Sequence, residues 1–365
     1  MRTVMIAMDP AQPDATLLAH LGTRLRVGEL VAFPTETVYG LGADATNARA
    51  VRTIFAAKGR PTTDPLIVHI PDAEAVAQVT GHDLADLSPL VRLLADRFWP
   101  GPLTLILPRG PRIPDEVTAG LATVGVRVPE HSLARALIAA ARVPIAAPSA
   151  NRFGHTSPTT AQHVLADLAR RIPWILDGGP CPIGVESTIL DVTQPQPVLL
   201  RPGGVPIEAI EAATGLTVIR RPRQTADGVQ AALAPGMLLT HYAPRTPLLV
   251  IEGDDVAVIS RRVLHEIRQA VAQGRRVGVL VPSESLSAAQ AAGASNMLPL
   301  GAMGNPSQAA QQLFAGLRAL DDANVDVIIC GSFPDEGIGR ALRDRLWRAA
   351  SGHVIALPKD EDAVE

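Results

Sequence analysis

The sequence Lys58-Gly59-Arg60-Pro61-Thr62-Thr63-Asp64-Pro65-Leu66-Ile67-Val68-His69-Ile70 joins a basic loop directly to an apolar strand. Lys58 and Arg60 flank a glycine, and two prolines restrict the loop that carries them. Arginine offers a planar fork for phosphate or carboxylate oxygens and lysine a compact charge, so the pair suits an anion such as a polyphosphate. A basic surface turn before a core strand is the alternative, and this stretch alone leaves both interpretations open.

The size and charge of the chain limit its class. A length of 365 residues predicts two domains rather than one core. The formal charge of −3 argues against a nucleic-acid binder coated in positive charge, although a local basic groove stays possible. Aromatic residues make up only 3%, so little stacking on bases is expected.

Cysteine usage and hydropathy indicate the compartment. The two cysteines, Cys181 and Cys330, lie far apart and form no C-x-x-C pattern, which predicts a reducing environment without a disulfide framework or zinc site. We expect both to be buried as small apolar residues. No stretch approaches the roughly 18 uninterrupted apolar residues of a membrane helix, and the first apolar run is too short for a signal peptide. The chain is therefore expected in the cytoplasm, with no membrane partner.

In the first half of the chain, loops rich in hydroxyl and arginine side chains adjoin the predicted strands. The strand Leu30–Phe33 leads into the loop 34–45, and the strand 143–147 leads into the loop 148–159. Arg201 ends another strand. Some of these hydroxyls would serve as turn or helix-capping residues. Their convergence beside strand ends is nevertheless typical of a small-molecule site on an α/β scaffold.

Arg127 lies in a stretch that alternates as a strand does. Residues 123–129 place Arg127 on the face opposite Val126 and Val128. From spacing alone, such an arginine is more often a surface residue than a functional one.

The second half of the chain predicts a linker followed by a smaller domain. Residues 217–247 are rich in proline and arginine, as linkers are. Beyond them, strands at 248–251, 277–281 and 325–330 alternate with helices at 256–273 and 307–322, which predicts a parallel sheet. We therefore expect a catalytic domain over residues 1–215, a linker or lid over 216–247 and a second domain over 248–365.

Several chemistries are not supported by the motifs. The sequence contains no G-x-x-x-x-G-K-[ST] loop, no H-E-x-x-H, no G-x-S-x-G and no paired acidic motif for a metal. The match Gly40-x-Gly42-x-x-Ala45 imitates a dinucleotide fingerprint, but the loop from Pro34 separates it from its strand. What remains is a site of cations, hydroxyls and backbone amides. Such a site binds a nucleotide and a polar co-substrate and acts by positioning and charge stabilisation.

Six ordered motifs resemble one known family, the YrdC-type threonylcarbamoyl-AMP synthases. They are Phe33–Gly42, Lys58–Pro61 with Pro65–His69, Trp99–Thr104, Pro148–Asn151, Glu186–Thr188 and Leu200–Gly203. The segment His241-Tyr242-Ala243-Pro244 and the domain after it resemble the long, two-domain branch of this family. The resemblance implies a twisted, mixed α/β sheet with a concave basic face, joined to a smaller Rossmann-like β-α-β domain.

The resemblance also implies a reaction. Members of the family join L-threonine, bicarbonate and ATP to give threonylcarbamoyl-AMP and pyrophosphate, for modification of the adenosine next to the anticodon in tRNA. Mg²⁺ would enter with ATP, because the sequence offers no dedicated metal cage. A downstream tRNA threonylcarbamoyl transferase machinery would take the product, and tRNA itself is a possible partner.

Site residues follow from the same resemblance, position by position. The implied threonine contacts are Thr37, His69, Arg127, Ala147 and Ser187, and an arginine is the natural clamp for a carboxylate. The implied catalytic residues are Lys58 and Arg60. The implied ATP contacts are Lys58, Arg60, Asp64, Thr123, Ser149, Asn151, Ser157, Arg201 and Tyr242.

Asp64 departs from the family pattern, in which asparagine is common. A carboxylate beside phosphates repels them unless a metal bridges the two. The role of Asp64 therefore stays open at this point.

Two functions from other classes compete with this interpretation. One is a non-catalytic protein that binds tRNA or double-stranded RNA through the basic face. The other is a carbamoyl-transferring maturation enzyme, against which the cysteine count argues because such proteins carry zinc fingers. The second domain could be structural or regulatory, and the sequence does not decide between these roles.

Overall fold

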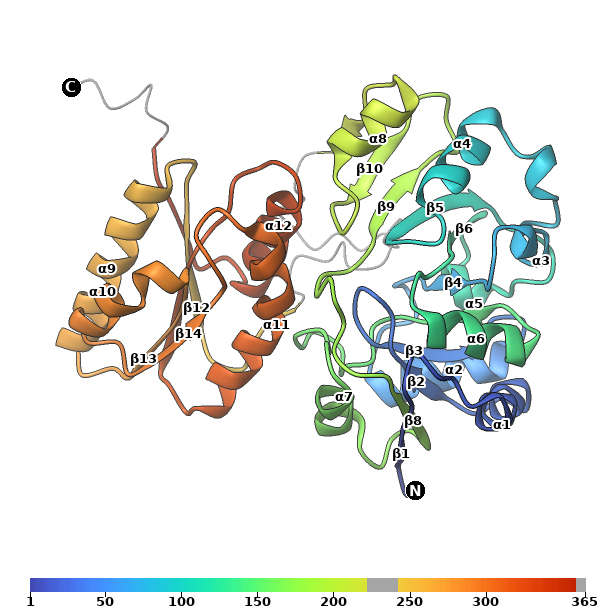
Figure 1. Ribbon diagram of the computed structural model, residues 1–365, viewed down its shortest axis with the longest axis horizontal. Coiled ribbons are helices and arrows are strands. Elements are labelled where there is room, and N and C mark those ends of the chain that lie inside the picture. The colour runs from blue at the N-terminus through green and yellow to red at the C-terminus, as the bar shows by residue number, and fades with distance from the viewer. Residues whose placement is uncertain (222–241, 359–365) are drawn as a thin grey trace. The chain divides into compact units, whose positions relative to one another are not determined.

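The computed structural model describes residues 1–221 and 242–358 (Figure 1). The chain divides into two compact units, each with its own sheet. Of the described residues, 1–153 and 157–221 belong to the first unit, and 154–156 and 242–358 belong to the second. Most of the predicted linker, 216–247, falls outside the described residues.

The first unit contains a long mixed sheet, as expected from the sequence. Its eleven strands among the described residues run in the order β1-β8-β2-β3-β7-β4-β6-β5-β9-β10-β11, with parallel and antiparallel pairs. In chain order they are β1 (Val4–Ala7), β2 (Val31–Phe33), β3 (Gly40–Asp44), β4 (Ile67–His69), β5 (Leu103–Pro108), β6 (Thr123–Arg127), β7 (Ile145–Ala146), β8 (Trp174–Asp177), β9 (Thr188–Asp191), β10 (Val198–Arg201) and β11 (Ile219–Arg220).

The helices of the first unit connect these strands. They are α1 (Ala15–Arg26), α2 (Ala48–Lys58), α3 (Ala77–Thr80), α4 (Pro89–Phe98), α5 (Asp115–Thr118), α6 (Ser132–Ala141), α7 (Ala161–Leu168) and α8 (Ile207–Thr214), with short 3₁₀ turns at Glu74–Val76 and Leu84–Asp86. Asn47 caps the start of α2, and Gly59 ends it in the left-handed conformation that glycine adopts without strain. Lys58 is thus the last helical residue, and the basic loop begins directly after it.

Alternation along the strands separates a core face from the face that carries polar residues. Val68 of β4, Val126 of β6 and Leu105 of β5 point into the larger apolar core. Their neighbours His69 and Arg127 are cross-strand partners, so both lie on the opposite face. The predicted placement of Arg127 opposite Val126 is confirmed.

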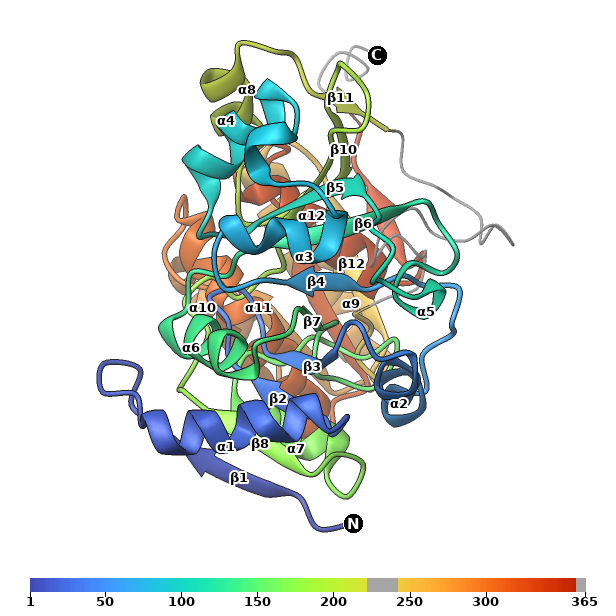
Figure 2. The ribbon, with the colours of Figure 1, turned by 90° about the vertical axis from the view of Figure 1, so that its right-hand side faces the viewer.

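Helices α1 and α6 pack side by side on that second face, where it is formed by β2, β7 and β8 (Figure 2). Val31 and Phe33 of β2 contact this helix pair, while Ala32 between them faces the larger core. Gly22 of α1 allows the close approach, because a Cβ there would lie 2.6 Å from the backbone carbon of Ala140.

The second unit contains a parallel sheet in the order β14-β13-β15-β12-β16, which confirms the Rossmann-like expectation. The strands are β12 (Leu248–Glu252), β13 (Val277–Val281), β14 (Asn296–Pro299), β15 (Val327–Gly331) and β16 (Val354–Ala356). The helices are α9 (Val256–Ala272), α10 (Leu286–Ala291), α11 (Pro306–Asp322) and α12 (Gly339–Ala349), with a 3₁₀ turn at Ser283–Ser285. Figure 1 shows α9 and α10 on one side of the sheet and α11 and α12 on the other.

The structure places sheet residues beyond the predicted domain boundary at residue 215. The N–H of Ile219 donates to the carbonyl of Pro197 over 2.9 Å, and β11 pairs in parallel with β10. Residues 219–220 therefore extend the first sheet rather than begin a linker. Two residues are too few to show the alternation by which a strand is predicted.

Both cysteines are buried and unbonded to each other, as predicted. Among the described residues, no helix is long and apolar enough to cross a bilayer.

Gly22→Ala tests the contact between α1 and α6. Alanine favours helix, yet its methyl group would meet backbone atoms that cannot move independently. We expect the free energy of unfolding to fall by about 1–3 kcal/mol, measured by urea denaturation.

The matched control is Gly316→Ala in α11, where the methyl group would meet only the end of the Leu280 side chain. Because that side chain can rotate away, the cost should be smaller. Equal losses in the two variants would contradict the proposed backbone contact.

Candidate active site

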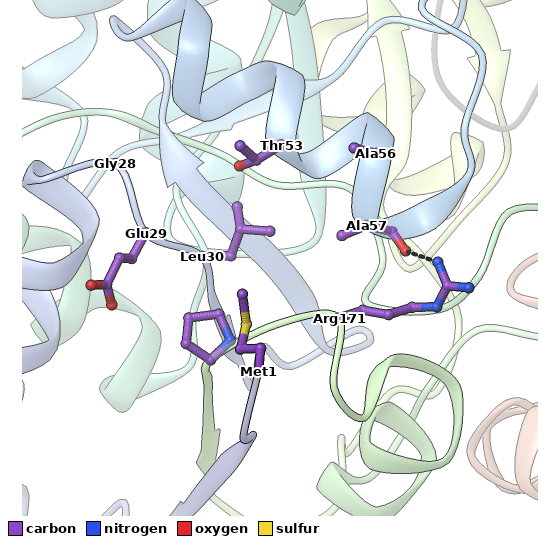
Figure 3. A pocket seen from close by; sticks show the side chains of 9 residues that line it. Met1, Gly28, Glu29, Leu30, Thr53, Ala56, Ala57 and Arg171 are labelled. Carbon is purple, nitrogen blue, oxygen red and sulfur yellow. Dashed lines mark hydrogen bonds between the residues drawn. The ribbon is translucent and has the colours of Figure 1, made fainter.

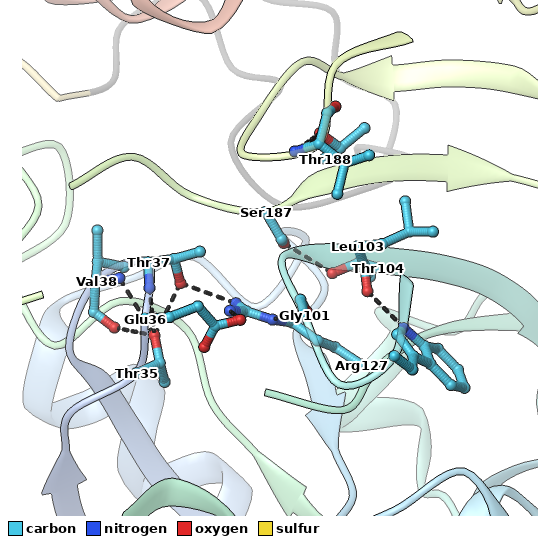
Figure 4. A network of polar contacts seen from close by, with 12 residues as sticks. Thr35, Glu36, Thr37, Val38, Gly101, Leu103, Thr104, Arg127, Ser187 and Thr188 are labelled. Carbon is cyan, nitrogen blue, oxygen red and sulfur yellow. Dashed lines mark hydrogen bonds and ion pairs between the residues drawn. The ribbon is translucent and has the colours of Figure 1, made fainter. Parts of the chain in front are cut away.

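Arg127 is the centre of the first group of site residues (Figure 4). Its Nε donates to the carbonyl of Gly101 over 3.2 Å, and its Nη1 donates to the hydroxyl of Thr37 over 2.9 Å. Its Nη2 forms an ion pair with Oε1 of Glu36 at 2.5 Å. The side chain is buried, so these three contacts hold the guanidinium in one orientation. Thr37 and Arg127, both predicted threonine contacts, are therefore brought together.

His69 lies on the strand next to Arg127 and is paired with it in register. Its ring meets the ring of Phe33 edge to face, with centroids 6.3 Å apart. Burial, and then the nearby charge of Arg127, lower the pKa of His69 to about 3, so the imidazole is neutral at ordinary pH. Among the described residues, Nδ1 has no hydrogen-bond partner. A neutral imidazole next to a fixed guanidinium suits contact with a polar ligand rather than with an anion alone.

Ser187 contacts a second arginine, Arg201, and a threonine of the strand next to β6. Its hydroxyl lies 2.8 Å from the hydroxyl of Thr104, on β5. Its carbonyl accepts from Nε of Arg201 at 3.2 Å and from Nη2 at 2.9 Å, and its hydroxyl lies 3.1 Å from Nη2. Gly203 makes this packing possible, because a Cβ there would lie 2.2 Å from the backbone carbon of Ser187. Ser187 therefore belongs to the predicted threonine contacts and also holds a predicted ATP contact.

The basic loop after α2 forms the second group. Nη2 of Arg60 lies 2.9 Å from Oδ1 of Asp64 and donates to the carbonyl of Pro65 over 2.8 Å. Nε of Arg60 donates to the carbonyl of Asp64 over 3.2 Å. Backbone carbonyls and one carboxylate of the loop therefore fix the orientation of the Arg60 guanidinium. Within the described ranges, neither carboxylate oxygen of Asp64 has a well-aligned hydrogen bond, although the side chain is fully buried.

Lys58 is held by the loop that follows β7. Its Nζ donates to the carbonyls of Ser149 and Asn151 at 2.6 Å and 2.5 Å. Burial, followed by repulsion from Arg60, lowers the pKa of Lys58 well below its ordinary value. Burial also raises the pKa of Asp64, against the opposing effects of Arg60, Lys58 and Arg201. Lys58, Arg60, Asp64 and Arg201 are all buried and interact electrostatically, and we call these four residues the cation cluster.

The remaining predicted residues are placed as follows. The hydroxyl of Ser157 donates to Oε1 of Glu186 over 2.5 Å. The N–H of Ala147 donates to the carbonyl of Ile67 over 2.9 Å, beside β4. Thr123 begins β6, half-buried on the same face as Arg127.

The structure places Tyr242 in the second unit, where its ring lies 5.6 Å from that of Phe314 and 5.1 Å from the guanidinium carbon of Arg345. Its nucleotide contact stays a prediction.

Glu36, Thr104 and Glu186 belong to the site but were not singled out from the sequence. All three lie inside motifs that carried the resemblance, next to Thr37, Leu103 and Ser187. The sequence motifs therefore contained these three positions, but they did not indicate the distant residues that each side chain contacts.

An apolar cavity of about 400 Å³ lies elsewhere in the first unit (Figure 3). Leu30, Thr53, Ala56 and Ala57 contribute to its lining, with Glu29 and Arg171 at its edges. It contains none of the predicted site residues. Its chemistry does not match a polyphosphate or an amino acid, so the polar groups around Arg127 and Lys58 are the candidate active site.

Comparison with known proteins identifies the family. Residues 23–203 match a family model described as telomere recombination, and residues 205–351 match one described as threonylcarbamoyl-AMP synthase, C-terminal domain. The threonylcarbamoyl-AMP synthase of Bacillus subtilis is 47% identical over 339 residues, which cover 93% of this chain and 94% of that protein. The chain belongs to the threonylcarbamoyl-AMP synthase family. It is therefore an enzyme, and the non-catalytic RNA-binding alternative is not supported.

A solved structure of this threonylcarbamoyl-AMP synthase family has the same fold over nearly the whole chain. It is described as Pyrococcus abyssi Sua5 complexed with L-threonine, and it aligns with a TM-score of 0.89 and 39% identity over 98% of this chain and 100% of that one. The threonylcarbamoyl-AMP synthase of P. abyssi is 44% identical over 333 residues, or 91% of this chain and 94% of that protein. The two-domain organisation of the family therefore extends to this chain.

His69→Gln tests the neutral, buried state of the imidazole. The folded pKa of about 3 lies below the ordinary 6.5, so between these values the unfolded chain binds a proton that the folded chain does not. His69 therefore makes the free energy of unfolding fall as pH falls, by up to about 1.4 kcal/mol per pH unit. We expect the variant to lose less stability than the wild type between about pH 6.5 and about pH 4, measured by urea denaturation.

The exposed His82 provides the matched control, because His82→Gln removes a histidine that lies in solvent rather than in the core. If His69→Gln changed the pH dependence of unfolding no more than His82→Gln does, the buried, neutral state of His69 would be contradicted.

Proposed function

We propose that this enzyme joins L-threonine, bicarbonate and ATP at the site formed by the Arg127 group and the cation cluster. The observation that carries the proposal is the position of Ser187, which contacts Arg201 of the cation cluster and also Thr104 of β5, the strand that pairs with the Arg127 strand β6. An amino-acid subsite and a phosphate subsite would therefore adjoin. The threonine named in the structure of the P. abyssi relative supports the same substrate here.

In the amino-acid subsite, Arg127 would bind the threonine carboxylate. A guanidinium that is already fixed by Gly101, Thr37 and Glu36 loses little freedom when it binds, which favours affinity and orientation. His69 and Ser187 would contact the remaining polar atoms of threonine, and Ala147 would line the subsite.

In the phosphate subsite, Lys58, Arg60 and Arg201 would neutralise the triphosphate. In the first unit, Ser149, Asn151, Ser157 and Thr123 would complete the nucleotide contacts. Among residues 1–221 and 242–358, no group of three or more His, Cys, Asp or Glu side chains could hold a metal ion. We propose that Mg²⁺ arrives as part of the MgATP substrate, held by the phosphate oxygens.

The proposed reaction has two steps, in which atoms and charges balance. The amino group of threonine forms a C–N bond with the carbon of bicarbonate, and water leaves, giving a carbamate. A carbamate oxygen then attacks the α-phosphorus of ATP, and the bond to the β-phosphate oxygen breaks. The products are threonylcarbamoyl-AMP and pyrophosphate. The described side chains would act by positioning the reactants and by stabilising the charge on the leaving phosphates.

Asp64 would act on Arg60 rather than on the nucleotide. Its carboxylate lies 2.9 Å from the Arg60 guanidinium, and its backbone carbonyl accepts from the same side chain. A phosphate that approached Arg60 would meet a guanidinium already oriented by its own loop. The net charge of the cation cluster remains positive when Lys58, Arg60 and Arg201 are charged, despite Asp64.

The product would serve threonylcarbamoyl modification of tRNA, as in the family. We propose that a downstream transferase takes the product directly, in the cytoplasm, because a mixed anhydride of a carbamate and a phosphate is reactive toward water.

Pyrophosphate release by the purified full-length chain tests the proposed reaction. It should require both L-threonine and bicarbonate in addition to MgATP. Serine lacks one methyl group and should be used with a kcat/KM lower by about tenfold or more. Pyrophosphate release that was independent of threonine would contradict the proposal.

Arg60→Ala tests the phosphate subsite. The single substitution would leave the buried carboxylate of Asp64 without its ion-pair partner and could destabilise the fold. The double variant Arg60→Ala/Asp64→Asn also removes that carboxylate, so it separates an effect on catalysis from an effect on folding. The double variant should unfold at nearly the wild-type temperature and release pyrophosphate about a hundredfold more slowly.

Asp64→Asn alone is the matched control, because it keeps Arg60. It should retain most of the activity. If the double variant were no slower than this control, Arg60 would not contribute to the phosphate subsite.

A further inference from the structure

Glu36 carries a carboxylate of which the described contacts use only one oxygen. Its Oε1 forms the ion pair with Arg127 at 2.5 Å. Its Oε2 is buried and has no hydrogen-bond partner among the described residues. The residue as a whole is 3% exposed. The structure therefore contains a buried carboxylate oxygen to which the described residues supply no hydrogen-bond donor.

The backbone around Glu36 is fixed on both sides, so the carboxylate is not a mobile surface group. The carbonyl of Glu36 accepts from the N–H of Ile183 over 2.9 Å, and the carbonyl of Thr37 accepts from the N–H of Gly184 over 3.1 Å. Figure 4 shows the carboxylate facing the Arg127 guanidinium. The position of Oε2 is thus set by the same loop that supplies Thr37.

Orienting Arg127 does not account for a carboxylate at this position. One acceptor oxygen is enough for the contact that Glu36 makes with Nη2, and an amide could supply it. Burying a second, charged oxygen is costly unless a partner meets it. A partner that arrives with the substrate would remove that cost, and it would have to be a hydrogen-bond donor, preferably a cation.

Arg127 and Glu36 together define the class of that ligand. In the described contacts Arg127 uses three of its five N–H groups, and Glu36 uses one of its two oxygens. The pair therefore presents a donor edge and an acceptor oxygen side by side. A zwitterion with an adjacent carboxylate and ammonium matches both, and an α-amino acid is such a molecule.

We propose that Oε2 of Glu36 binds the amino group of threonine while Arg127 binds its carboxylate. This assignment rests on the proposed function, and it adds a substrate contact that the sequence motifs did not assign. It holds the reacting nitrogen in a set direction for the bicarbonate carbon. It also makes the site selective for a free amino group over a hydroxyl or a hydrogen at the same carbon.

The other buried carboxylates fit an amino group less well. Asp64 lies among Lys58, Arg60 and Arg201, and three cations disfavour a fourth. Oε1 of Glu186 accepts from Ser157. The charged and titratable groups close to Glu36 are Arg127, His131 and Cys181. Burial lowers the pKa of His131 and raises that of Cys181, so Arg127 is the one fixed charge among these three neighbours.

The test compares two ligands on two proteins. The ligands are L-threonine and (R)-3-hydroxybutyrate, which is threonine without its amino group. The proteins are the full-length wild type and Glu36→Gln, which keeps the shape and the acceptor toward Arg127. Dissociation constants are measured by ligand-observed NMR. Glu36→Gln should weaken threonine at least tenfold and change 3-hydroxybutyrate less than twofold, because only threonine has the group that Oε2 binds.

Arg127→Lys is the matched control and should weaken both ligands, since both carry the carboxylate. Glu36→Asp keeps the charge and should keep part of the preference for threonine. This variant also decides the case in which Glu36→Gln does not fold, because an aspartate variant without any preference for threonine would contradict the assignment.

The outcomes separate this inference from the proposed function. Equal weakening of both ligands by Glu36→Gln would overturn the inference and leave Glu36 acting only through Arg127. Unchanged binding of both would overturn it as well. A wild type that bound neither ligand, with or without MgATP, would overturn the proposed function and the inference together.

Discussion

The buried guanidinium of Arg127 is the constraint on which the site depends. It lies on β6, yet its partners come from the turn at Gly101 and from the loop that carries Glu36 and Thr37. Burying this charge without those acceptors would cost more than a small domain can tolerate. Folding of the first unit therefore brings three distant parts of the chain to one point, and the site is assembled as part of the core.

The two halves of the site differ in how their buried charges are compensated. Around Arg127, one cation is matched by one carboxylate. In the cation cluster, Lys58, Arg60 and Arg201 all interact electrostatically with Asp64, and Lys58 is additionally held by two carbonyls. The first arrangement is nearly neutral and suits a zwitterion. The second keeps a positive excess and suits a triphosphate, so the charge balance of each half indicates its ligand.

Much of this arrangement could be predicted from the sequence because it is local. Alternation placed Arg127 opposite Val126, and the basic loop after Lys58 was recognisable from spacing. The ion pair between Glu36 and Arg127 could not be predicted, because no local pattern encodes a contact between residues so far apart. Helix α12 was missed for a related reason. Its arginines obscure the apolar stripe, although Arg345 is fully buried and paired with Asp344 at 2.6 Å. The strand β11 was too short for any periodicity.

The contacts of Ser187 limit how the substrate preference of this enzyme can change by substitution. The hydroxyl and carbonyl of Ser187 contact Arg201, the proposed nucleotide contact, and the same hydroxyl contacts Thr104 beside the proposed amino-acid subsite. A substitution there would alter both subsites at once. Evolution toward another amino acid, or its engineering, therefore has little freedom at this serine. Ala147, whose side chain takes part in no such network, offers a more independent route to a changed substrate preference.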